Sequence, residues 1–122
     1  MSEEVREKEE KATLYGWAYA VGKVLFECLK MKHGGDEEQA IKKMKNIILN
    51  LRSELIPDKF RRELINVIIE ITSDCEKSVG IREEVREERP WTVDEFYRYS
   101  TAILSGLYDA VFGIKRKSEG GR

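Results

Sequence analysis

Three carboxylates could support metal-dependent chemistry if one helix carries them together. Glu63, Glu70 and Asp74 follow one another at spacings of seven and four residues, which places them near one side of a predicted helix. Carboxylates that converge from two helices can hold the divalent cations used in nucleotide hydrolysis. Other predicted helices offer only Glu27 and Asp109 in their core regions, and the paired pattern Glu-x-x-Glu then Glu-x-x-Asp is absent. A solvated acidic face is therefore favoured, and we expect no catalytic residue, no metal and no cofactor.

The stretch from Gln39 through Ser53 contains no acidic residue. Its basic side chains lie away from the apolar stripe on a helical wheel, and further basic residues open the next predicted helix. A surface rich in Lys, Arg and Asn without carboxylates suits a phosphate backbone, bound by charge and shape instead of base sequence. A normal solvated helix face is the alternative. The candidate nucleic-acid-binding residues are Lys42, Lys45, Arg52, Lys59, Arg61 and Arg62.

Aromatic residues near the C-terminal end of the chain could add base stacking. They could equally belong to the core or to a protein interface. These residues are Trp91, Tyr97, Tyr99 and Tyr108.

Small residues recur four apart in two stretches, ATLYGWAYA (12–20) and AILSGLYDA (102–110). A glycine inside a helix costs about 0.5–1 kcal/mol relative to alanine, so its presence needs a reason. Small residues on one face let another helix approach closely. We predict that the first and last helices pack on each other, or on a second copy, through these faces; a local kink is the alternative. The two stripes are Ala12, Gly16 and Ala20, and Ala102, Gly106 and Ala110.

The two cysteines, Cys28 and Cys75, each fall on the apolar stripe of a predicted helix. Buried free thiols are the favoured interpretation, and a disulfide, as found in hyperthermophiles, is the alternative. The single histidine, His33, follows the last turn of the first predicted helix, where a cation complements the helix dipole.

These residues must be positioned by helices, because apolar residues recur every three to four positions in four segments. The segments cover about 4–32, 37–55, 58–79 and 93–115. Gly34-Gly35 and Gly80 predict helix ends, whereas Asp36, Pro57 and Thr92 predict helix starts. We therefore expect an all-α, four-helix bundle in a single domain over residues 1–115, followed by a mobile basic tail over 116–122.

Composition limits the classes of partner. The chain has 122 residues and a formal net charge of −1, so no global charge attracts it to nucleic acid or membrane. Locally, residues 23–62 carry ten Lys or Arg against six Asp or Glu, and residues 63–96 carry four against ten. The many Glu, Lys and Arg residues are typical of thermophile surfaces. A charged start without a signal peptide, and no long apolar run, predict a cytoplasmic protein without membrane association.

The last predicted helix, FYRYSTAILSGLYDAVFGIKRK (96–117), ends a short helical chain with aromatics, small residues and basic residues. This layout resembles the small, non-catalytic subunits of archaeal CRISPR effector complexes, and the resemblance covers the plan of the whole chain. It implies several copies stacked along a crRNA-guided complex, contacting one another and the backbone subunits. It also implies that basic faces steady the target or displaced strand. The phosphate contacts would then be Lys42, Lys45 and Arg52, together with Arg61 and Arg62.

Three functions are therefore expected, in decreasing order of support. The first is a non-enzymatic subunit of a nucleoprotein assembly, which makes weak, sequence-independent contact with nucleic acid and contacts other subunits. The second is a self-associating adaptor that has only protein partners. The third is the metal-dependent hydrolase.

Overall fold

The computed structural model describes residues 3–73, 75 and 91–113, with side-chain surroundings from Ala12 onward. Four α-helices make up the described chain: α1 (Glu3–Lys32), α2 (Glu37–Ser53), α3 (Pro57–Thr72) and α4 (Val93–Tyr108). A five-residue π-helix, η2 (Asp109–Gly113), continues α4. The expected all-α, four-helix architecture is confirmed, and no strand occurs in the described ranges.

Two helix boundaries differ from expectation. The third helix, α3, ends at Thr72 instead of continuing to about 79, and Ser73 Oγ donates to the carbonyl of Glu70 at 3.1 Å. The regular α-helix of α4 ends at Tyr108, where the wider π-helix begins. The predicted end at Gly80, the connector before Trp91 and the tail over 116–122 lie outside the described residues.

Local chemistry explains three other helix ends. Gly34 and Gly35 have φ values of 63° and 89°, a left-handed backbone that glycine adopts without steric cost. The side chain of Asp36 accepts a hydrogen bond from the Gln39 amide at 3.2 Å and so caps α2. Thr92 and Glu95 form the reciprocal capping box that starts α4. These three helix ends confirm the sequence-based boundaries.

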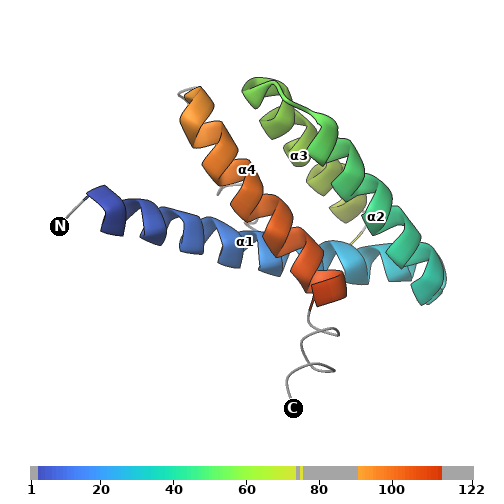
Figure 1. The fold of residues 1–122 in the computed structure, drawn as a ribbon. Helices are drawn as coiled ribbons and strands as arrows, with labels where there is room; N and C mark the ends of the chain where they lie inside the picture. Colours follow the sequence, from blue (N-terminus) through green and yellow to red (C-terminus); the bar gives the residue numbers. More distant parts are fainter. Residues whose placement is uncertain (1–2, 74, 76–90, 114–122) are drawn as a thin grey trace, which may run out of the picture.

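The helices are arranged as an antiparallel pair, α2 and α3, beside two crossing helices, α1 and α4 (Figure 1). The first half of α1 extends past α4, away from α2 and α3. Of the helix pairs, α1 and α4 share the most extensive interface. Large apolar side chains from all four helices are fully buried between them; these include Leu25, Met44, Leu51, Phe60, Leu64, Ile68, Ile103 and Leu107. Burial of this apolar surface provides the main driving force for folding.

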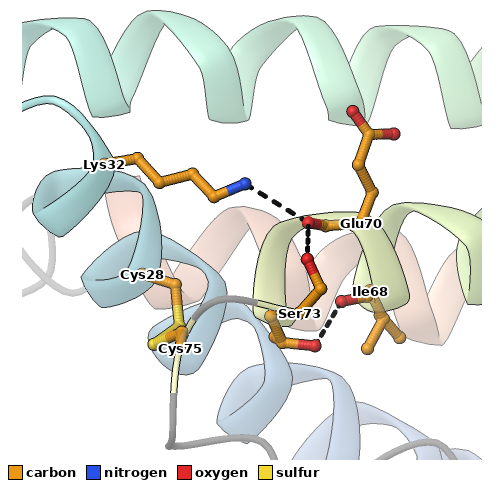
Figure 2. The surroundings of a disulfide bond; sticks show 7 residues. Cys28, Lys32, Ile68, Glu70, Ser73 and Cys75 are labelled. Carbon is orange, nitrogen blue, oxygen red and sulfur yellow. Dashed lines mark hydrogen bonds between the residues drawn. A yellow bond between two sulfur atoms is a disulfide. The ribbon is translucent and has the colours of Figure 1, made fainter.

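A disulfide joins Cys28 in α1 to Cys75, just beyond α3 (Figure 2). The favoured expectation of two free thiols was therefore wrong. Sequence periodicity placed both residues on apolar faces, but could not show that the two backbones approach to a Cα–Cα distance of 5.9 Å. Beside the disulfide, the Lys32 ammonium donates to the Glu70 carbonyl at 3.3 Å, so α1 and α3 are joined twice at this end.

The disulfide closes a loop between residues 47 apart in sequence, and this predicts its contribution to stability. A cross-link of this span restricts the unfolded chain and is expected to stabilise the fold by about 4 kcal/mol. Denaturant unfolding of the oxidised protein should therefore show a much higher midpoint than unfolding in dithiothreitol.

The double variant Cys28→Ser/Cys75→Ser is the control for this comparison. Its unfolding should match that of the reduced protein and should not respond to dithiothreitol. Equal midpoints for oxidised and reduced wild-type protein would contradict the assignment.

Candidate functional site

The small residues of α4 bring its backbone against α1. A Cβ atom added at Gly106 would lie 2.5 Å from the Tyr15 carbonyl oxygen and 2.9 Å from the Tyr19 amide nitrogen. Such distances are sterically forbidden, so only glycine fits at this crossing. Ala102 of α4 is buried, and Ala110, which belongs to η2, is half-buried. For α4, the structure therefore places the small-residue stripe against α1, as the spacing suggested.

The corresponding stripe of α1 lies elsewhere. Ala12, Gly16 and Ala20 are exposed, and a Cβ atom added at Gly16 would meet no atom within 4 Å. The expectation that this stripe packs on α4 within the chain is therefore wrong. A different face of α1, which contains Ala18 and Gly22, meets α4. A Cβ atom added at Gly22 would lie 2.7 Å from the Ala110 Cβ. Packing of the exposed stripe on a second copy stays a prediction.

A hydrogen bond links the two helices at the junction of α4 with the π-helix. The Tyr15 hydroxyl donates to the Asp109 carboxylate at 2.5 Å. This hydrogen bond, helped by burial and by the negative charge of Asp109, raises the pKa of Tyr15 to about 12. Neither residue was a candidate for this pairing, because nothing in the sequence relates positions 94 apart.

The cations of α2 remain on the surface. Lys42, Lys45 and Arg52 are exposed, and none forms an ion pair with a carboxylate among the described residues. The Lys45 ammonium lies 5.9 Å from the centre of the Phe112 ring in η2, which orients this side chain toward the end of α4. We call Lys42, Lys45 and Arg52 the α2 cations.

The basic residues at the start of α3 lie in a different environment. Lys59 and Arg62 line a shallow hollow together with the carboxylates of Glu54, Glu63 and Glu70. The Arg61 guanidinium lies 5.4 Å from the centre of the Trp91 ring, whose residue is only 7% exposed. The structure therefore separates the α2 cations from Lys59 and Arg62 in a mixed-charge hollow and from Arg61, which lies over Trp91.

An open hollow of about 500 Å³ lies between α2 and α4. Ile48, Arg52 and Leu55 of α2 and its following turn line one side of it. Tyr97 and Tyr108 of α4 line the other side and are 59% and 40% exposed. We call this hollow the α2–α4 groove; its remaining lining residues include Glu54, Phe60, Phe96, Thr101, Leu104, Ser105 and Asp109.

The four aromatic candidates separate into two pairs. Trp91 and Tyr99 are 7% and 8% exposed, and their rings meet edge to face at 5.2 Å in the core. Tyr97 and Tyr108 lie in the α2–α4 groove. The Tyr108 ring also packs on Phe112 at 4.9 Å, and Phe112 in turn meets Lys45. The exposed aromatic residues are thus adjacent to the α2 cations.

The hydrolase interpretation requires several carboxylates that converge from two helices. Glu63 and Glu70 lie beside Lys59 and Arg62 on α3, while Asp74 lies outside the described residues. Within residues 3–73, 75 and 91–113, no three His, Cys, Asp or Glu side chains form a group that could hold a metal ion. No described helix is long and apolar enough to cross a membrane.

Comparisons with known proteins identify no relative. No protein-family model, curated protein or solved structure matches this chain.

The crossing of α1 and α4 predicts opposite effects for one substitution at two glycines. Gly106→Ala places a methyl group against the α1 backbone, which cannot move aside alone, so we expect destabilisation of about 1–3 kcal/mol or more. Gly16→Ala adds a methyl group in open space and improves helix propensity, so we expect a gain of about 0.5–1 kcal/mol. Denaturant unfolding of both variants checks this, and shifts of the same sign would contradict the observed crossing.

The Tyr15–Asp109 hydrogen bond predicts a loss of stability at alkaline pH. The folded-state pKa of Tyr15 lies above its usual value of 10.0. The hydrogen bond therefore contributes fully to the free energy of unfolding below pH 10, and this contribution is lost as the pH rises toward 12. Tyr15→Phe removes both the hydrogen bond and this part of the pH dependence. Unfolding free energies of wild type and variant, measured between pH 8 and 12, should converge. Parallel curves would contradict the assignment.

Proposed function

We propose that this chain is a non-enzymatic helical subunit of a nucleoprotein assembly that contacts a phosphate backbone through α2. The observation that carries the proposal is the exposure of the α2 cations without a carboxylate partner among the described residues. The chain has 22 Lys or Arg and 23 Asp or Glu, so acidic partners are abundant in the sequence. A group of cations that pairs with no carboxylate in the described part of the chain can bind an external polyanion.

The spacing of these residues suits a nucleic-acid strand. Lys42 and Arg52 are ten residues apart in one helix, which corresponds to about 15 Å along its axis. This distance is long enough for the three cations to contact more than one phosphate of the same strand. Three cations over such a length provide weak binding that is independent of sequence, because contacts to phosphates carry no sequence information.

The resemblance in layout suggests a crRNA-guided CRISPR effector complex as the assembly. In that setting, weak contact by each copy is sufficient, because several stacked copies act together on one strand. The α2 cations would then steady a strand that other subunits hold in place.

A self-associating adaptor is the second candidate function. The observation that favours it is the exposed stripe of Ala12, Gly16 and Ala20, which no described part of the chain covers. Sedimentation at increasing protein concentration distinguishes the two, because an adaptor forms oligomers without nucleic acid and does not bind oligonucleotides.

Two matched charge reversals test nucleic-acid binding. Lys42→Glu/Arg52→Glu changes the α2 cations, whereas Lys59→Glu/Arg62→Glu makes the same change among the carboxylates of α3. Fluorescence anisotropy with labelled RNA and DNA oligonucleotides, at several salt concentrations, should show salt-sensitive binding by the wild type. The α2 variant should bind more weakly and should reduce the slope of log K against log salt by about two.

The α3 variant should retain most of the affinity. Equal losses in the two variants would show that net charge alone matters and would contradict a site on α2. Absence of salt-sensitive binding by the wild type would contradict the proposed function itself.

A further inference from the structure

The α2–α4 groove combines two features that occur together at sites for single-stranded nucleic acid. Arg52 lines one side of it, and Lys45 lies at its end beside Phe112. Tyr97 and Tyr108 line the opposite side with large exposed fractions. Proteins that bind single strands without sequence preference use cations to follow the backbone and aromatic rings to stack the bases.

We infer that the α2–α4 groove accepts the unstacked bases of a single-stranded nucleic acid, with Tyr97 and Tyr108 as stacking platforms and the α2 cations as phosphate contacts. This inference rests on the proposed function, and it adds the strand type and the residues that select it. A duplex is a poorer ligand, because its bases are already stacked and paired and cannot reach the rings.

The dimensions of the groove agree with this assignment. Tyr97 and Tyr108 are eleven residues apart, which corresponds to about three turns and about 16 Å along α4. Both rings therefore lie on one side of α4, and Lys42 and Arg52 are separated by a similar length along α2. A volume of about 500 Å³ falls within the range of about 300–1,000 Å³ that is usual for small-molecule sites.

The charges around the groove determine which part of the nucleotide enters it. Glu54 and Asp109 also line the groove, and the Asp109 carboxylate accepts the hydrogen bond from Tyr15. These carboxylates disfavour phosphates inside the groove, whereas Arg52 in its lining and Lys45 beside Phe112 attract phosphates to the α2 side. Uncharged bases therefore fit the interior, beside the tyrosine rings and the hydroxyls of Thr101 and Ser105.

A comparison of three ligands and two double variants tests the inference. The ligands are a labelled 15-nucleotide oligothymidine, an abasic strand of the same length and a 15-base-pair duplex. Tyr97→Ala/Tyr108→Ala removes both rings, and Tyr97→Phe/Tyr108→Phe keeps the rings while removing the hydroxyls. Circular dichroism should show that both variants fold, because the two side chains are exposed.

We expect the wild type to bind oligothymidine more tightly than the abasic strand or the duplex. The alanine variant should bind oligothymidine at least about fivefold more weakly, which corresponds to the loss of one base–aromatic stack. Its affinity for the abasic strand and the duplex should not change, and the phenylalanine variant should bind all three ligands as the wild type does.

Each other result overturns a specific step. If the alanine variant binds oligothymidine as the wild type does, while Lys42→Glu/Arg52→Glu weakens it, the groove is not the base site but the proposed function stands. If the wild type binds none of the three ligands, the proposed function and this inference both fail. If the alanine variant loses self-association in sedimentation and keeps oligonucleotide binding, the groove binds protein instead.

Discussion

The contact of the α4 backbone with the α1 backbone at Gly106 determines the arrangement of the other elements. A single added methyl group would meet the Tyr15 carbonyl and the Tyr19 amide, so the two helices are as close as their main chains allow. This crossing fixes α4 on α1, and the Tyr15–Asp109 hydrogen bond secures the end of the same interface. Because α4 is held mainly by α1, it leaves the α2–α4 groove open along α2.

The disulfide connects the α2–α3 pair to α1. It joins α1 to the end of α3, so the α2–α3 pair is anchored on the same helix that carries α4 (Figures 1 and 2). Disulfides persist in oxidising compartments, and in the intracellular proteins of hyperthermophiles. The cytoplasmic location and the thermophile source both stay predictions, and this disulfide makes the first depend on the second.

Local signals in the sequence predicted the local structure well. Apolar periodicity predicted the four helices, and the capping residues Asp36 and Thr92 predicted where two of them begin. Features that depend on how helices meet were not predictable in this way. Ala12, Gly16 and Ala20 are spaced as regularly as the small residues that meet α1 from the other helix. Which face of α1 is covered depends on how α1 is rotated about its axis where α4 crosses it, and the spacing does not show this rotation. The disulfide, the Tyr15–Asp109 pair and the groove likewise join residues distant in sequence.

Nucleic-acid contact through one face of α2 and the facing side of α4 is the central claim. The most direct measurement is a titration of ¹⁵N-labelled protein with oligothymidine, followed by amide chemical shifts. The account predicts saturable shifts around Lys42, Lys45 and Arg52 and around Tyr97 and Tyr108, with none around Gly16. Shifts that concentrate at Gly16, or no saturable shift in the two groove helices, would contradict it.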